Sequence, residues 1–185
     1  MKIIWITWPA AAGKWTVVDY FVNKLWFVHY SASWYLTEIL KSQNKEINRD
    51  TMRELADSLR AQYGPSYLIS ELYNQAAKNW KNAIIESVRT VWEVELLRGK
   101  ENFILLSIEP DQELRYKRAI ERNSAKDHIS FEKFKEQEDL EAASSDPNKW
   151  NIKACQKLAD VEIQNNWDMK ALEESIEHIL KTYQI

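Results

Sequence analysis

Short apolar runs alternate with longer amphipathic segments along this chain. Five runs are rich in isoleucine, valine, leucine or phenylalanine and predict buried strands: 2–7, 27–30, 83–86, 103–108 and 161–163. Helical spacing of apolar residues predicts helices over 16–25, 32–41, 49–62, 65–79, 93–98, 112–122, 130–142, 152–158 and 169–181. This alternation predicts a three-layer α/β fold, in which a five-stranded parallel sheet carries helices on both faces.

The 185 residues are enough for one domain, 1–185, with its own core. The helical patterns within residues 31–80 form an insert between the second and third strands. Polar residues 123–130 and 144–149 bracket one charged helix, which predicts a small helical lid at about 123–148.

Composition and charge exclude several classes of protein. The formal net charge is −3, from 25 basic and 28 acidic residues, so we expect no nucleic-acid partner. Cys155 is the only cysteine and the three histidines are scattered, which predicts neither disulfides nor a histidine metal site. No apolar run reaches the roughly 18 residues of a membrane span. We therefore expect a cytoplasmic enzyme that does not bind membranes.

The segment that follows the first strand resembles a phosphate-binding loop. It reads Trp5-Ile6-Thr7-Trp8-Pro9-Ala10-Ala11-Ala12-Gly13-Lys14-Trp15-Thr16 and leads into the first amphipathic helix. With glycine in place of tryptophan at positions 5, 8 and 15, it becomes G-I-T-G-P-A-A-A-G-K-G-T. That sequence fits the G-x-x-x-x-G-K pattern.

The chain has nine tryptophans and only three glycines. Together they make about 6.5% of the chain, close to the usual glycine content of about 7%. Trp26 stands where a helix should end, and the polar neighbours of four others are typical of turns: Trp34, Trp80, Trp150 and Trp167. Our hypothesis is that one class of glycine codon appears here as tryptophan. The alternative is a natural tryptophan-rich protein, and Trp92 fits the hypothesis least.

A phosphate loop surrounds the β-phosphate with backbone N–H groups, and the following helix adds its positive end. The nucleotide-binding residues would be Trp8, Ala10, Ala11, Ala12, Gly13, Lys14, Trp15 and Thr16. Lys14 would bridge the β- and γ-phosphates, and the Thr16 hydroxyl would contact a phosphate oxygen or the Mg²⁺ shell. A literal tryptophan at position 8 or 15 would weaken or abolish this binding, because its side chain would occupy the space of the ligand.

Four further segments resemble the P-loop nucleotide kinases, the group of adenylate kinase, other nucleoside monophosphate kinases and dephospho-CoA kinase. His29-Tyr30-Ser31-Ala32-Ser33 is similar to H-I-S-T-G, and residues 84–89 take the place of D-G-x-P-R. Residues 115–122 are similar to the R-x-x-R-x-x-x-R run that enters the lid. Residues 159–168, with glycine at 167, are similar to the A-D-x-V-I-x-N-N-G-S of dephospho-CoA kinases.

The resemblance implies ATP and Mg²⁺ as cofactors. It implies catalytic roles for Lys14, Arg89, Arg118 and Arg122, an acceptor site in the insert with Ser31, Ser33, Arg53, Glu86 and Arg89, and a Mg²⁺ site at Thr16 and, through water, Glu86. From the residues alone, a solvated helix face is the alternative for Arg118 and Arg122, and salt bridging is the default for Arg53 and Arg60. The chain departs from the family at Glu86, at the missing Gly-Pro before Arg89, and at Lys126, Lys133 and Lys135, where adenylate kinases have arginines.

We therefore predict an ATP-dependent phosphotransferase with a small-molecule nucleotide acceptor, a nucleoside monophosphate, and a monomeric or weakly dimeric state. A dephospho-CoA kinase-like enzyme is one alternative, and a nucleotide-binding protein without turnover is another. The kinase fold also implies that the strand ending at Thr7 is central, between those ending at Glu86 and Ile108.

Overall fold

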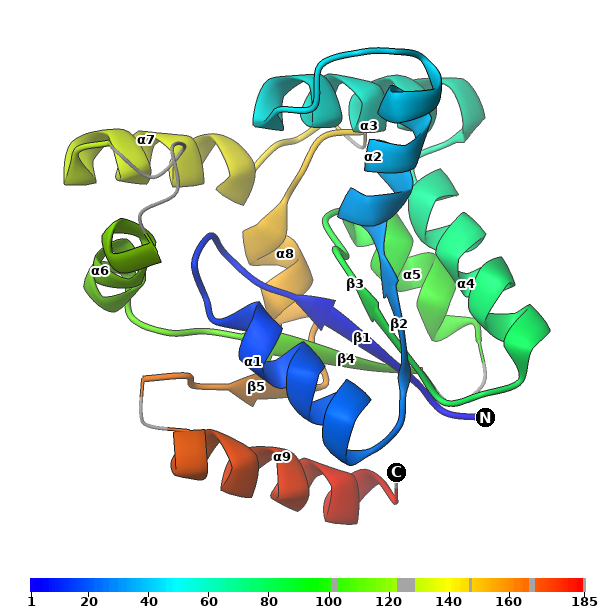
Figure 1. The fold of residues 1–185 in the computed structure, drawn as a ribbon, viewed down its shortest axis with the longest axis vertical. Helices are drawn as coiled ribbons and strands as arrows, with labels where there is room; N and C mark the ends of the chain where they lie inside the picture. The colour runs from blue at the N-terminus through cyan, green and yellow to red at the C-terminus, as the bar shows by residue number, and fades with distance from the viewer. Residues whose placement is uncertain (101–102, 123–128, 147, 167–168, 185) are drawn as a thin grey trace.

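The computed structural model describes residues 1–100, 103–122, 129–146, 148–166 and 169–184. Its sheet has five parallel strands: β1 (Ile3–Thr7), β2 (Val28–Ser31), β3 (Ala83–Glu86), β4 (Phe103–Ile108) and β5 (Val161–Ile163). The strand order is β2-β3-β1-β4-β5, so β1 lies between β3 and β4 (Figure 1). The predicted fold and central strand are both confirmed.

Every residue of β1 is buried, and alternate side chains of β1 enter two different cores. Ile4 and Ile6 belong to the core under α1 (Lys14–Asp19) and α9 (Met169–Tyr183), and Ile3 and Trp5 to the core on the opposite face. That opposite face is covered by α4 (Tyr67–Asn79), α5 (Val91–Arg98) and α8 (Ile152–Lys157) (Figure 1). Each such fully buried side chain stabilises the fold by roughly 1.5–3 kcal/mol.

The insert consists of α2 (Ala32–Ser42), α3 (Arg49–Tyr63) and α4, and it has a small core of its own around Leu36, Ala56 and Leu68. Polar caps set where its first two helices begin. The Ser31 side chain accepts a hydrogen bond from the Trp34 N–H, and Asn48 forms a reciprocal capping box with Thr51.

The lid prediction concerns α6 (Gln112–Arg122) and α7 (Phe131–Ala142), which lie together at one side of the molecule (Figure 1). The Tyr116 ring packs on Phe131 and Phe134 at centroid distances of 5.2 and 5.6 Å. Residues 123–128 and 147 of the predicted lid, including Lys126, lie outside the described residues, and the lid stays a prediction. None of the helices in the described ranges has the length and apolar character to cross a membrane.

Some of the tryptophans lie at backbone positions that are typical of glycine, and others do not. Trp26 and Trp80 have φ of 61° and 51° in the left-handed region that favours glycine, and Trp150 lies in a loop before α8, as the hypothesis expects. The turn predicted at Trp34 is wrong, because Ser31 caps α2 and places Trp34 in its first turn. Trp5 is no loop residue: it is a strand residue with 1% exposure, stacked 6.3 Å from the Tyr73 ring. Trp167 lies outside the described residues.

Candidate functional site

The phosphate loop, residues 8–13, follows β1 at the carboxyl edge of the sheet and leads into α1. Gly13 has φ of 81°, and a Cβ there would lie 2.3 Å from the Asn165 Nδ2. Only glycine fits that position without a rearrangement. The helix begins at Lys14, two residues earlier than predicted, and its last turn is a π-helix, Tyr20–Lys24.

Three side chains from distant parts of the chain hold alternate carbonyls of the phosphate loop. The hydrogen bonds run from Arg89 Nη1 to Trp8 O at 2.6 Å, from Arg115 Nη1 to Ala10 O at 3.1 Å and from Asn165 Nδ2 to Ala12 O at 2.9 Å. The loop is therefore fixed by α6 and by the segments that follow β3 and β5, and not by its own sequence alone.

Lys14 and Glu86 form a buried ion pair between the phosphate loop and the end of β3. The Ser31 hydroxyl donates to Glu86 Oε1, and His29 Nε2 lies 3.5 Å from the same oxygen. Burial alone would raise the pKa of Glu86, but His29, Lys14 and Ser31 together lower that pKa to about 2. Glu86 is therefore ionised at neutral pH. The Lys14 side chain is only 12% exposed.

Arg89 lies two residues after Ser87, a non-glycine residue with φ of 79°. The Arg89 guanidinium lies over the Trp8 ring at 4.2 Å and faces the Trp150 ring at 5.3 Å. Burial lowers the pKa of Arg89, and the carboxylates of Glu141 and Glu86 oppose that shift. An arginine keeps its charge in such a setting, so a cation is held inside the protein beside the phosphate loop.

The Trp8 ring lies against both cations of the site. Lys14 Nζ is 4.7 Å from its centroid, and the Arg89 Cζ is 4.2 Å from it. Trp15 differs, because its ring is 61% exposed and makes an edge contact with His29 at 5.7 Å. The ring at position 8 therefore contacts both cations, and the ring at position 15 lies 4.2 Å from Lys14 Nζ.

Other predicted site residues lie at different distances from the loop. Arg118 Nη1 is 3.7 Å from where a Cβ on Gly13 would be, and the Thr16 N–H donates to the Gly13 carbonyl at 3.1 Å. Arg122 is exposed at the last residue of α6, and Ser33 is exposed in the first turn of α2. Arg53 pairs with Asp50 at 2.8 Å on the exposed side of α3. The functional roles of these residues stay predictions.

Arg115 and Asn165 are contacts that sequence reasoning did not assign to the loop. Arg115 is 7% exposed, donates to the Pro110 carbonyl at 3.1 Å and pairs with Glu138 of α7. Burial lowers the pKa of Arg115 to about 10, against the opposing charge of Glu109. Both residues belong to segments that the sequence singled out, residues 115–122 and 159–168. The sequence did not indicate which atoms of the loop they contact.

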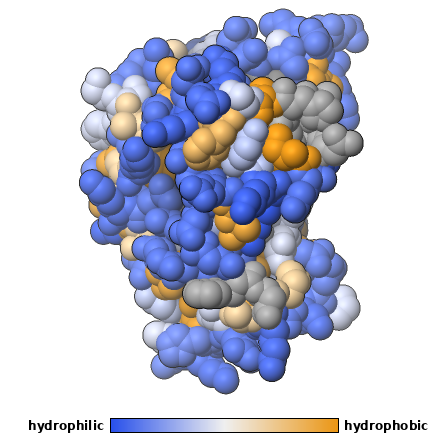
Figure 2. Space-filling view, turned by 90° about the vertical axis from the view of Figure 1, so that its left-hand side faces the viewer, coloured by the Kyte–Doolittle hydropathy of each residue, from blue (hydrophilic) through white to orange (hydrophobic). Residues whose placement is uncertain are grey.

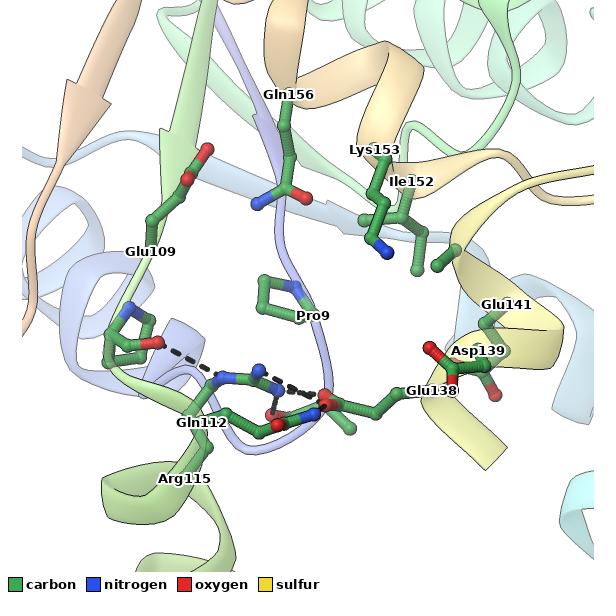
Figure 3. Close-up of a pocket in the computed structure, with 13 residues that line it drawn as sticks. Pro9, Glu109, Gln112, Arg115, Glu138, Asp139, Glu141, Ile152, Lys153 and Gln156 are labelled. Carbon is green, nitrogen blue, oxygen red and sulfur yellow. Dashed lines mark hydrogen bonds and ion pairs between the residues drawn. The ribbon is translucent and has the colours of Figure 1, made fainter. Parts of the chain in front are cut away.

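A cavity of about 220 Å³ lies beside the phosphate loop, between α6, α7 and α8 (Figure 3). Pro9 and Ala10 line it from the loop, Arg115 and Glu138 lie at one end, and Lys153 comes from α8. The face of the molecule that carries α6 and α7 is mostly hydrophilic, with small separate hydrophobic areas (Figure 2). The lining of the cavity combines charged side chains with apolar ones such as Ile152, and the cavity adjoins the phosphate loop without being lined by Lys14 or Arg89.

Sequence comparison finds relatives among the UPF0200 proteins. No family model matches the chain. A UPF0200 protein from Methanosarcina mazei is 25% identical over 149 residues, which cover 79% of this chain and 76% of that protein. A UPF0200 protein from Methanosarcina barkeri is 28% identical over 102 residues, covering 54% and 52%.

Solved structures are similar over nearly the whole chain. The protein TT1252 from Thermus thermophilus superposes with a TM-score of 0.65 at 14% identity and covers 98% of this chain and 97% of its own. Shikimate kinase from Bacteroides thetaiotaomicron has a TM-score of 0.63 at 13% identity, with 100% and 99% covered. Shikimate kinase from Acinetobacter baumannii, solved with shikimate, has a TM-score of 0.58 at 13% identity, with 98% and 94% covered. The chain has the three-layer fold of the P-loop kinases.

Proposed function

We propose that this protein is an ATP-dependent phosphotransferase that acts on a nucleoside monophosphate. The observation that carries the proposal is that Lys14 and Arg89 both lie against the ring of one phosphate-loop residue, Trp8, on a P-loop kinase fold. Two cations that flank one small space are suited to hold a phosphoryl group between donor and acceptor. In this chain the Trp8 ring lies against both cations.

Each residue of the site has a role in this proposal. Lys14 would leave Glu86 and bind the β- and γ-phosphates, Arg89 would hold the acceptor phosphate, and Arg118 and Arg122 would neutralise the transferring group. Ser31, Ser33 and Arg53 would contact the acceptor from the insert. Since phosphoryl transfer depends mainly on alignment and charge neutralisation, no dedicated base is required.

Thr16 and the ionised Glu86 have the hard oxygen atoms that Mg²⁺ prefers. When bound, Mg²⁺ would neutralise charge on the β- and γ-phosphates. Within the described ranges, no group of three or more His, Cys, Asp or Glu residues could hold a metal ion. In this proposal one or two protein ligands and the phosphates of the nucleotide would hold the Mg²⁺.

The test is a coupled assay of the variant with glycine at positions 8 and 15, using AMP, CMP, deoxynucleoside monophosphates, dephospho-CoA and shikimate as acceptors. We expect ADP release that depends on a nucleoside monophosphate. Turnover with dephospho-CoA would favour the alternative that residues 159–168 suggest. Turnover with shikimate, the substrate named for the structural neighbours, would replace the nucleotide as acceptor.

A nucleotide-binding protein without turnover is the second candidate, and the position of the Trp8 ring favours it. In the proposed site that ring would occupy the place of the transferring group. ATP binding without ADP release from any acceptor would support this candidate. In either case we propose a cytoplasmic protein, monomeric or weakly dimeric.

A further inference from the structure

A buried ion pair joins the insert to the strand end that carries Arg89. Glu93 of α5 is 0% exposed and Arg60 of α3 is 2% exposed. Glu93 Oε1 accepts hydrogen bonds from Arg60 Nε at 3.2 Å and from Arg60 Nη2 at 3.0 Å. A pair of charges this deeply buried contributes little net stability, because both groups lose their hydration. Its contacts therefore need another explanation.

The second carboxylate oxygen of Glu93 holds the backbone of the site. Glu93 Oε2 accepts from the Arg89 N–H at 2.7 Å and from the Thr90 N–H at 3.1 Å. One carboxylate thus connects α3 to the backbone of Arg89, whose side chain reaches the Trp8 carbonyl at 2.6 Å. The contacts form a continuous chain from Arg60 through Glu93 and Arg89 to the phosphate loop.

The α3 end of this chain of contacts is incompletely satisfied. Arg60 Nη1 and Asp57 Oδ1 are buried without a hydrogen-bond partner among the described residues, and they lie 3.8 Å apart. Buried polar atoms without partners are costly. Asp57 and Arg60 both belong to α3, so a rotation of the Arg60 side chain toward Asp57 would shorten this distance and remove that cost, and it would also change the contact of Arg60 with Glu93.

We propose that Arg60 and Glu93 are positioning residues, which set the place of Arg89 at the phosphate loop according to the place of α3. The inference rests on the proposed function, in which the insert binds the acceptor and Arg89 holds the acceptor phosphate. Acceptor binding against α3 would then be coupled to the alignment of Arg89. Neither Arg60 nor Glu93 touches the reacting groups in this proposal.

The position of Arg89 can be measured in the chain as written, because its guanidinium faces the Trp8 and Trp150 rings. All nine tryptophans are replaced by 5-fluorotryptophan, and Trp8→Phe and Trp150→Phe assign the two relevant ¹⁹F resonances. We expect Arg60→Met to shift both resonances by more than a line width and to leave those of Trp26 and Trp80 unchanged. The double variant Arg60→Met/Glu93→Gln should shift them no further than Arg60→Met.

The matched control is Glu38→Gln, which removes an exposed ion pair with Lys41 at 2.9 Å on another helix of the insert. It should move neither resonance. If Arg60→Met does not fold, Arg60→Lys replaces it, because lysine keeps the charge and loses the two-nitrogen contact. A folded Arg60 variant with both resonances unmoved overturns the proposal.

The second readout is kinetic and uses the variant with glycine at positions 8 and 15. Arg60→Met should raise KM for the acceptor by about tenfold, the size of an ordinary coupling between sites, with KM for ATP unchanged. A merely structural role would reduce the amount of active enzyme and leave both KM values alone, which would overturn the proposal. If no acceptor is phosphorylated, the proposed function fails, and the ¹⁹F shifts alone decide whether Arg60 positions Arg89.

Discussion

At the scale of single residues, Lys14 combines a structural contact with a proposed role in nucleotide binding. It is predicted to bind the phosphates of ATP, yet in this structure it neutralises the buried carboxylate of Glu86. In the proposed function, nucleotide binding would exchange Glu86 for phosphate as the main partner of Lys14. The same buried pair means that changing Lys14 affects stability as well as chemistry.

In the variant with glycine at positions 8 and 15, we expect Lys14→Ala to reduce phosphotransfer by about 100-fold or more, because charge on the β- and γ-phosphates is no longer neutralised. It should also lower the free energy of unfolding by roughly 3 kcal/mol, because Glu86 is left buried without its cation. Adding Glu86→Gln should recover most of the stability and none of the rate. Kinetics and urea unfolding on the three variants separate the two effects, and a double variant with full turnover would remove Lys14 from the phosphate site.

Acid should remove the contribution that ionised Glu86 makes to the free energy of unfolding. The folded-state pKa of about 2 lies below the ordinary value of 4.5, so the contribution of Glu86 to stability is complete above about pH 4.5 and disappears as the pH falls toward 2. The difference in unfolding free energy between the wild type and Glu86→Gln should therefore be constant from pH 7 to 5 and shrink below that. Urea unfolding at each pH measures it. A difference that already shrinks between pH 8 and 6 would contradict the lowered pKa.

At the scale of the helices, the tryptophans test where the backbone needs glycine. Trp26 and Trp80 lie at left-handed helix ends, with exposures of 85% and 81%, whereas Trp34 lies inside the first turn of α2. In the chain as written, we expect Trp26→Gly and Trp80→Gly each to stabilise the protein by about 1 kcal/mol, since a left-handed non-glycine residue costs that much. Trp34→Gly should destabilise it by roughly 0.5 kcal/mol. Denaturant unfolding of the three variants is the measurement, and an equal sign for all three would reject this assignment.

The sequence predicted the elements well because their signals are local. Strands β3, β4 and β5 and helix α6 have the bounds that their apolar patterns indicated. The left-handed ends at Trp26 and Trp80 were also predictable, since a helix that stops among polar residues needs such an end. The start of α1 at Lys14 was not, because the phosphate loop closes through tertiary contacts.

Contacts between distant residues could not be predicted in the same way. The hydrogen bond from Asn165 to the Ala12 carbonyl joins residues 153 positions apart, and nothing in either local sequence specifies the partner. The interpretation of position 5 as a loop glycine was wrong for a different reason. Trp5 belongs to β1, and because β1 pairs with β3 and β4, the Trp5 side chain lies in the core. A motif indicates which residues matter, and the sheet determines what they touch.

At the scale of the whole molecule, we expect some tryptophans to affect ligand binding and others to affect stability, according to where they lie. The ring at position 8 contacts both cations, and position 15 adjoins Lys14 with its ring 4.2 Å from Nζ. Trp5 should be kept, because replacing a fully buried indole by glycine costs roughly 3–5 kcal/mol of core packing. The informative protein is therefore Trp8→Gly/Trp15→Gly, with Trp26→Gly/Trp80→Gly as the matched control.

We expect ATP·Mg²⁺ at about 100 times its Kd to stabilise Trp8→Gly/Trp15→Gly by roughly 2.7 kcal/mol, since only the folded state binds it. For a chain of this length that corresponds to a rise in Tm of about 5–10 °C. At the same ATP concentration the chain as written should rise far less, because the Trp8 ring holds the place of the phosphate. Trp26→Gly/Trp80→Gly should have a higher Tm without ATP and no larger response to it. Thermal melts of the three proteins with and without ATP give the answer, and equally tight binding by the chain as written would refute both the glycine hypothesis and the assignment of position 8 to the phosphate path.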